Sequence, residues 1–457
     1  MAKIRKIFGS TTSLNFNSKE QDFGLYWESF KKSKLGRIYN SIPWDGLVKE
    51  FGLKEHNKGR ASTFSPQGKI ALQFLKSYTR LSDKMLLERI NADYEFQFFC
   101  GVDINVAEPL ENFKLLSEIR TELGLKLDIQ QTQKVLAGAW GGYMSGTEKM
   151  MGDATCYESH IRYPTDVKLL WEANEWVYKQ VKVFSKAIKK RIPRSKFGEQ
   201  KSKQLDYSKK KRKTRKQTRK RIKSLLYLLG KLLGQLYETE QLLPEGTEMS
   251  DTYQRRLSAI TTVLDQQQML YEGEKVKDRI VSIDKAYVRP IIRGKESKRV
   301  EFGAKANILQ VDGINFIEHI SFNAFNEGIR LIGSVELAEW LFGNKVEKLA
   351  GDNIYANNAN RSYCTRNGIT TSFVRKGRPS KEEETLKQTR KELGVERATK
   401  MEGAFGTQKN HYNLDRIKAR TEKNEILWVF FGIHMANAVE ISKRKKKPKI
   451  EKDKLAA

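Results

Sequence analysis

Three carboxylates in this chain stand in local settings that suit phosphodiester chemistry. Asp153 follows an apolar stretch, within the sequence Gly-Asp-Ala-Thr-Cys of residues 152–156. Asp352 ends the short apolar run 349–351, and Glu402 lies in a helical pattern with Lys409 seven residues later. Cleavage of a phosphodiester bond without a covalent intermediate needs an activated water or hydroxyl and a stabilised leaving oxygen. Two divalent cations about 4 Å apart can supply both, held mostly by carboxylates.

Each acid also has an ordinary structural interpretation, because a chain with 55 acidic residues contains many such triplets. Asp153 could be a buried aspartate satisfied by backbone donors. Asp352 could cap a helix or turn, which aspartate often does. Glu402 could belong to a solvated helix face. The settings of the three acids, and not their number, therefore carry the prediction.

Helical geometry favours a site that includes Glu402. Ala398, Glu402, Phe405 and Lys409 are spaced four, three and four residues apart and share one helical face. Glu402 and Lys409 are then separated by about 10 Å along the axis, a suitable distance for one to hold a metal and the other a phosphate. Gly403 and Gly406 each cost roughly 1 kcal/mol relative to alanine. A close approach of protein or nucleic-acid backbone would explain them, and so would an early end of the helix.

The elements expected to position these acids form a mixed α/β fold. The stretch 300–308 alternates apolar with other residues, which is typical of a half-buried strand, and Asp312-Gly313 predicts a hairpin turn. Ser334 is a candidate cap for a helix that Gly343 ends, and Asn357 for the helix after a strand at 346–350. The predicted order of elements is a strand, inserted helices, a hairpin, a helix, a strand and a helix. This order predicts a mixed sheet covered by helices.

Residues 40–145 read as helical. Ser65 is a candidate N-cap with proline after it, and Ser82 a second cap after a short turn. Two short helices joined so tightly could form a helix-turn-helix unit that contacts DNA. An ordinary helical bundle is the alternative.

Composition points to a polyanionic partner. The chain has 457 residues and a formal net charge of +30, and neutralised phosphates release condensed counterions. Basic charge alone does not separate DNA from RNA or an anionic membrane. The longest apolar stretch, 426–439, is too short to span a bilayer. Three scattered cysteines predict no disulfide framework or zinc site and fit a reducing cytoplasm.

The basic charge is concentrated between residues 182 and 223. This run holds twenty basic residues and only two acidic ones, which favours phosphate contact over a merely solvated segment. The candidate DNA-binding residues here are Lys210, Lys211, Arg212, Lys213, Arg215 and Lys216. Apolar seams at 222–236 and 253–271, separated by the Pro-Glu-Gly of 244–246, predict an antiparallel helical hairpin. A dimerising coiled coil is the competing interpretation.

Several blocks together resemble bacterial insertion-sequence transposases of the DDE type, in the broad insertion-sequence-five superfamily. The block 152–166 around Asp153 resembles the first-aspartate block, and 351–361 the second. Residues 288–305, with Gly294-Lys295, resemble the block after the insertion. The stretch 402–409, followed by 428–437, resembles the glutamate block, and residues 40–105 the N-terminal helical domain.

The resemblance implies a ribonuclease-H-like core that binds two Mg²⁺ ions, with Mn²⁺ as a substitute, through Asp153, Asp352 and Glu402. It also implies that Lys409 contacts DNA near the scissile phosphate. Related enzymes often carry an arginine four residues before the glutamate and a tyrosine three before that. Here those positions are Ala398 and Val395, so Arg397 is the candidate replacement.

The sequence thus predicts four parts. A helical DNA-binding domain (1–145) precedes a catalytic domain (146–164 and 278–441), which is interrupted by a basic helical insertion (165–277) and followed by a basic tail (442–457). The expected function is cleavage of double-stranded DNA at the terminal inverted repeats and strand transfer into target DNA. A homodimer in the bacterial cytoplasm, associated with the nucleoid and not with a membrane, would perform it. An inactive DNA-binding relic and a ribonuclease or resolvase on the same core are the alternatives.

Overall fold

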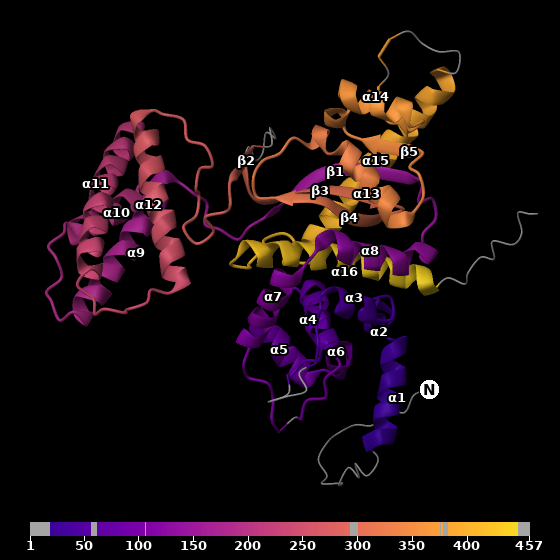
Figure 1. The fold of residues 1–457 in the computed structure, drawn as a ribbon, viewed down its shortest axis with the longest axis horizontal. Helices are drawn as coiled ribbons and strands as arrows, with labels where there is room; N and C mark the ends of the chain where they lie inside the picture. The colour runs from indigo at the N-terminus through magenta and orange to yellow at the C-terminus, as the bar shows by residue number, and fades with distance from the viewer. Residues whose placement is uncertain are drawn as a thin grey trace, which may run out of the picture.

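A computed structural model describes residues 19–55, 62–105, 107–292, 300–374, 376–377 and 383–446. Gly294-Lys295 and the tail beyond residue 446 lie outside this range. Figure 1 shows three parts: N-terminal helices, a sheet covered by helices, and a helical bundle joined to the sheet by extended linkers.

The N-terminal part is helical, as the sequence predicts. Ser65 caps one helix through the Gly68 N–H with Pro66 at its first turn, and Ser82 caps the next through the Met85 N–H. The elements are α1 (Lys19–Lys32), α2 (Lys34–Tyr39), α3 (Trp44–Glu50), α4 (Pro66–Thr79), α5 (Asp83–Ala92), α6 (Tyr94–Cys100), α7 (Lys114–Lys126), α8 (Ile129–Trp140) and η1 (Gly141–Tyr143).

The described residues form one six-stranded mixed sheet, which confirms the expected ribonuclease-H-like α/β core. The long central strand β1 pairs antiparallel with β3 and parallel with β5, while β4 and β2 add to β3, and β6 to β5. The Asp312-Gly313 turn has φ of 47° and 76°, as a tight hairpin requires. The strands are β1 (Lys149–Glu158), β2 (Pro290–Ile292), β3 (Val300–Val311), β4 (Ile314–Ser321), β5 (Lys348–Gly351) and β6 (Thr370–Thr371).

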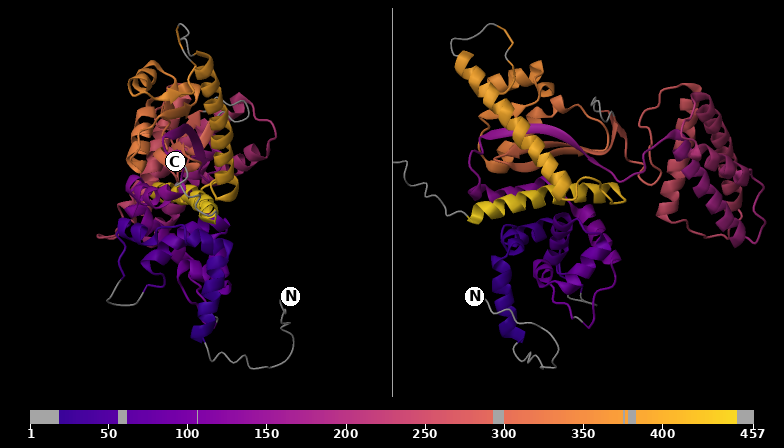
Figure 2. Two further views of the ribbon diagram at one scale, coloured as in Figure 1. Left: turned by 90° about the vertical axis from the view of Figure 1, so that its right-hand side faces the viewer. Right: turned by 180° about the vertical axis from the view of Figure 1, so that it is seen from behind.

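Helices cover both faces of the sheet, and the long α15 crosses it diagonally (Figure 2, right). Asn357 caps α14 and Gly343 ends α13, as predicted. Ser334 was wrongly predicted as a cap: it lies inside α13, where its hydroxyl donates to the Arg330 carbonyl and accepts from Asn307. These elements are η2 (Glu327–Ile329), α13 (Leu331–Phe342), η3 (Asn353–Tyr355), α14 (Asn358–Arg366), α15 (Glu383–His411) and α16 (Glu422–Lys446).

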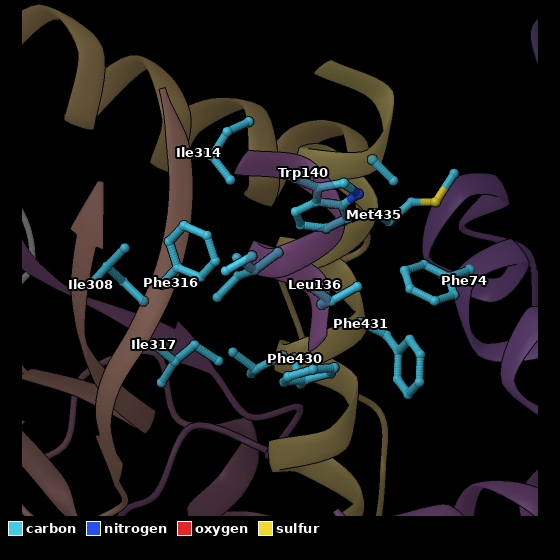
Figure 3. Packing of buried hydrophobic residues seen from close by; sticks show 14 of the residues in the cluster. Phe74, Leu136, Trp140, Ile308, Ile314, Phe316, Ile317, Phe430, Phe431 and Met435 are labelled. Atoms are coloured by element: carbon cyan, nitrogen blue, oxygen red, sulfur yellow. The ribbon is translucent and has the colours of Figure 1, made fainter. Parts of the chain in front are cut away.

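One apolar core joins the N-terminal helices to the sheet through α16. Figure 3 shows Phe430 beside Ile317 of β4 and Phe431 beside Phe74 of α4. The Phe74 and Phe431 rings meet edge to face with centroids 4.9 Å apart. Because α16 buries aromatic side chains on both sides, the N-terminal helices and the sheet share a single hydrophobic cluster.

The outer edge of β4 is closed by two buried side-chain amides. Gln133 of α8 accepts from the Ile317 N–H at 2.6 Å and donates to its carbonyl at 3.0 Å. Asn437 of α16 does the same at Asn315, at 3.0 and 2.7 Å. The two amides make the hydrogen bonds that a further strand would make. The N–H and carbonyl groups of Asn315 and Ile317 are therefore buried with partners.

Asn437→Ala is expected to destabilise the protein by about 2 kcal/mol, because it leaves the Asn315 N–H and carbonyl buried without partners. Urea unfolding followed by far-ultraviolet circular dichroism measures this loss. Asn410→Ala, at an exposed position on α15, is the control and should stay within about 0.5 kcal/mol of the parent. Equal stability of both variants would contradict a role for Asn437 in closing the edge.

The insertion between β1 and β2 folds as a bundle with its own apolar core. Its helices are α9 (Asp166–Ala187), α10 (Phe197–Lys209), α11 (Arg215–Glu240) and α12 (Asp251–Glu272). The predicted hairpin of α11 and α12 exists, but α11 packs mainly against α9. The apolar seam of α11 is therefore covered by helices of its own chain, which removes it as the seam of a dimerising coiled coil.

A buried ion pair ties both linkers of this bundle to the start of α16. Glu425 is fully buried and accepts from the Lys285 ammonium and the Ser159 hydroxyl. Lys285 also donates to the Ile417 carbonyl at 3.1 Å. Ser159 belongs to the linker that enters the insertion and Lys285 to the linker that leaves it, so one carboxylate fixes both.

Candidate active site at the end of strand β5

Asp153 lies on β1, and Asp352 immediately follows the neighbouring parallel strand β5. Gly152 of β1 pairs with Gly351 of β5, and each aspartate is the next residue of its chain. β5 ends at Gly351, whereas β1 continues to Glu158. The two carboxylates therefore stand where β5 ends beside β1.

Asp153 is mostly buried and is held by two donors. Arg397 of α15 donates to Oδ2 at 2.8 Å, and the Ala154 N–H donates to Oδ1 at 2.8 Å. Burial raises the pKa of Asp153, Arg397 opposes the rise, and the nearby charges of Glu327 and Asp352 add to it. A cation beside this carboxylate therefore favours its ionised form.

Asp352 is exposed, and its Oδ1 accepts from the Asn353 N–H at 2.6 Å as the cap of η3. The capping role considered from the sequence is present. It occupies one oxygen and leaves the carboxylate accessible to solvent.

Helix α15 runs in the same direction as β1 and places Glu402 level with Asp153. Glu396 bonds Lys149 at 2.9 Å, and Gln408 accepts from Tyr157 at 2.6 Å. Glu402 lies midway between Glu396 and Gln408, six residues from each. Asp153 lies midway between Lys149 and Tyr157, four residues from each. Glu402 is exposed, whereas its neighbour Met401 is buried against the core.

Lys409 reaches the same strand, as its Nζ donates to the Thr155 hydroxyl at 2.9 Å. Thr155 follows Asp153 by two residues, so both side chains lie on the face of β1 that α15 covers. Lys409 and Glu402 are seven residues apart on the helix and share that flank. The structure therefore brings Lys409 and Arg397 to the strand of Asp153.

The described residues contain no group of three or more His, Cys, Asp or Glu side chains arranged to hold a metal ion. Asp153 and Asp352 come together, while Glu402 stands on the flank of α15 at the same level. Helix α15 continues to His411, so an early end does not explain Gly403 and Gly406. No described atom lies within 4 Å of a Cβ added at either glycine, so protein packing does not explain them either.

Sequence reasoning missed a fourth acid beside the site. Glu327 of η2 pairs with Lys305 of β3 at 2.7 Å, and its charge acts on Asp153. The next residue, Gly328, packs against η3: a Cβ there would lie 2.5 Å from the Ile354 carbonyl oxygen. Glu327 lies in the short 3-10 helix η2, which no periodic pattern in the sequence marks, so only the contact between η2 and η3 reveals its position.

The predicted basic residues of the insertion are exposed on the bundle, away from the sheet (Figure 1). They lie at the junction of α10 and α11, which buried Arg221 fixes by donating to Gln204 and to the side chain and carbonyl of Gln200. The exposed set is Lys210, Lys211, Arg212, Lys213, Arg215 and Lys216. The junction is therefore an ordered basic surface.

None of the described helices is long and apolar enough to cross a bilayer.

Two segments match known protein families. Residues 349–429, which contain Asp352, Glu402 and Lys409, match the family described as Transposase DDE domain. Residues 26–122, in the N-terminal helices, match Transposase domain (DUF772). Comparisons with curated proteins and with solved structures give no match. The two domain matches, on a ribonuclease-H-like α/β fold, indicate a DNA transposase of the DDE type.

Proposed function

We propose that this chain cuts DNA at the ends of an insertion sequence and joins the released 3′ ends to target DNA. The observation that carries the proposal is that Asp153 and Asp352 each follow the last residue pair of β1 and β5, opposite a helix that bears Glu402 and Lys409. We place the chain in the insertion-sequence-five superfamily, in the subgroup with a helical insertion after the first aspartate. In this proposal residues 146–164 and 278–441 form the catalytic domain, and 1–145 and 165–277 bind DNA.

The donor set suits hard divalent cations. Two adjacent carboxylates repel each other, and the charge of Asp352 already acts on Asp153. Asp153, Asp352 and Glu402 would hold Mg²⁺ or Mn²⁺, since carboxylate oxygens are the preferred ligands of both. When bound, two such ions supply charge neutralisation at the attacking and leaving oxygens.

The chain's own groups position the DNA. Lys409, which donates to the Thr155 hydroxyl of β1, would hold a phosphate beside the acids in this proposal. Arg397 keeps the Asp153 carboxylate in one orientation. First, water attacks the phosphodiester bond at the element's end, and the 3′ oxygen leaves as a hydroxyl. That hydroxyl then attacks a target phosphate, and the displaced target 3′ oxygen takes up a proton.

A duplex that carries the terminal repeat tests this function. Incubation with the full chain and Mg²⁺ should nick the duplex at the repeat end, and EDTA should stop the reaction. Binding without nicking on any DNA would indicate an inactive relic. Preferred cleavage of an RNA–DNA hybrid or a four-way junction would indicate a ribonuclease or resolvase.

The basic junction of the insertion is proposed to contact phosphates. Replacing five residues of the set Lys210, Lys211, Arg212, Lys213, Arg215 and Lys216 by glutamine should make log K less dependent on log salt. Each lost phosphate contact should reduce the slope by about 0.9. Fluorescence anisotropy over a salt series measures this slope. An unchanged slope would leave the junction as a solvated surface.

We also propose that two copies act together, because both ends of an element must be held for coupled transfer. With the α11 seam covered, this pairing would use other surfaces or the DNA itself.

A further inference from the structure

The turn that begins at Asp352 is anchored in the core by Tyr355. Asp352 caps η3, and its carbonyl accepts from the Tyr355 N–H at 3.0 Å, so the two residues close one turn. Tyr355 is 2% exposed, whereas Asp352 is exposed. The Asn360 side chain donates to the Tyr355 carbonyl at 2.8 Å and ties the end of the turn to α14. A single 3-10 turn has poorer hydrogen-bond geometry than an α-helix, so its position depends on such anchors.

The Tyr355 side chain packs against the end of β5. A Cβ added at Gly351 would lie 3.4 Å from both Cβ and the ring atom Cδ2 of Tyr355. Tyr355, Gly351 and Gly152 line one cavity of about 10 Å³ together with Ser334 of α13. The tyrosine therefore lies on the side of the sheet that α13 covers, and glycine at position 351 leaves room for its ring.

The Tyr355 hydroxyl donates to a buried amide of β3. Its bond to Asn307 Oδ1 is 2.6 Å long, and Asn307 is fully buried. The Asn307 amide nitrogen donates to Glu318 at 2.9 Å and to the Ser334 hydroxyl at 3.0 Å. Burial raises the pKa of Tyr355 far above its ordinary value, so the hydroxyl stays protonated and can donate. Asn307 is therefore held by α13 and β4, and Tyr355 is held by Asn307.

Asn307 stands directly opposite the residue that follows Asp153. In the antiparallel pairing of β1 with β3, the partner of Asn307 is Ala154. One set of contacts therefore runs from Asp153 across the strand pair to Asn307, through the Tyr355 hydroxyl, and along η3 to Asp352. The pairing of Gly152 with Gly351 is a second link between the two acids. Strand pairing thus fixes Asp352 from the residue before it, and the Tyr355 hydroxyl from the turn after it.

We propose that Tyr355 is a positioning residue, which holds Asp352 where it can bind divalent cations together with Asp153. The inference rests on the proposed function and adds a residue that acts through Asp352. Groups that orient a metal ligand commonly contribute a factor of about ten or more to metal affinity, because they fix the direction of the ligand atom. Loss of the hydroxyl should therefore weaken cation binding and leave DNA binding unchanged.

Tyr355→Phe tests the proposal, because it removes the hydroxyl and keeps the ring against Gly351. Electron paramagnetic resonance measures Mn²⁺ binding to the full chain on a repeat-end duplex, and Asp153→Asn gives the signal from Mn²⁺ bound elsewhere. We expect Tyr355→Phe to weaken Mn²⁺ binding at the site by about tenfold. A Tyr355→Phe variant that binds Mn²⁺ as tightly as the parent would overturn the proposal.

Tyr253→Phe is the matched control. It removes a tyrosine hydroxyl that donates to Glu240 at 3.0 Å in the insertion, which has its own apolar core. Its Mn²⁺ affinity should stay within about twofold of the parent, since distant sites act independently. Circular dichroism checks that both variants fold. An equal loss of Mn²⁺ affinity in the two variants would also overturn the proposal.

Asn307→Ala tests whether the hydroxyl acts through β3. In that background Tyr355→Phe should change Mn²⁺ affinity by less than about twofold, because the acceptor is already gone. A further loss as large as the one expected in the parent would overturn the route through Asn307.

The metal dependence of nicking gives a kinetic readout of the same role. The Mg²⁺ concentration at half the maximal rate should rise by about tenfold in Tyr355→Phe, while the maximal rate and the DNA affinity stay near those of the parent. A lower maximal rate with unchanged Mg²⁺ dependence would overturn the role of Tyr355 alone. A parent chain that binds no more Mn²⁺ than Asp153→Asn and nicks no DNA would overturn the proposed function, and the role of Tyr355 with it.

Discussion

Asp153→Asn should reduce magnesium-dependent nicking of a repeat-end duplex by about a thousandfold or more while leaving DNA binding intact. The carboxylate would anchor a cation that contributes several kcal/mol to the transition state, and about 1.4 kcal/mol corresponds to a factor of ten in rate. Asp352→Asn and Glu402→Gln should have effects of the same order. Single-turnover cleavage under saturating protein measures the chemical step.

A nearby acid provides the control for this series. Glu396, six residues before Glu402 on the same helix, pairs with Lys149 and Lys400, and Glu396→Gln is the control variant. Its nicking rate should stay within about threefold of the parent. Full cleavage by any of the three site variants would exclude that residue as a metal ligand.

Lys285→Met should destabilise the fold by about 3–5 kcal/mol, because Glu425 would then be buried without its cation. Thermal unfolding followed by circular dichroism would show the loss. The double variant Lys285→Met with Glu425→Leu removes both charges and should recover much of it. A double variant as unstable as the single one would show that packing, and not the unpaired charge, is responsible.

The loss of folding stability in Lys285→Met should grow as the pH rises. Burial already raises the pKa of Glu425, while Lys285 and Ser159 oppose the rise. Without Lys285 the pKa rises further, so the folded state favours the protonated acid. Stability then falls as pH rises above the ordinary glutamate value, where the unfolded chain is ionised and the folded chain is not. Lys443→Met, at an exposed pair with Glu440, should show almost no such dependence.

Local patterns predicted most of the sheet and several caps. Ser65, Ser82 and Asn357 cap their helices because short polar side chains satisfy the first N–H groups, a rule that needs only neighbouring residues. Ser334 was misassigned because its hydroxyl serves a buried network with Asn307, and tertiary contacts of that kind leave no trace in spacing. The start of α13 at Leu331 carries no side-chain cap at all.

The sequence predicted the residues of the candidate site but not the contacts between them. Asp153 and Asp352 were chosen from local settings, and their adjacency depends on the register of β1 with β5, which sequence does not fix. Arg397 was named as a replacement for a missing arginine, yet its bond to Asp153 depends on how α15 crosses the sheet. Glu327 of η2 and Lys305 of β3 share no sequence pattern, so their ion pair was not predictable.

The amides of Gln133 and Asn437 have a consequence for how copies of this protein can assemble. An uncovered outer strand offers its backbone to a second molecule, and sheets can then continue from one copy to the next. At Asn315 and Ile317 that hydrogen-bonding capacity is already used by the chain's own helices. If two copies assemble on one DNA, as proposed, they would therefore not merge their sheets through Asn315 and Ile317 of β4.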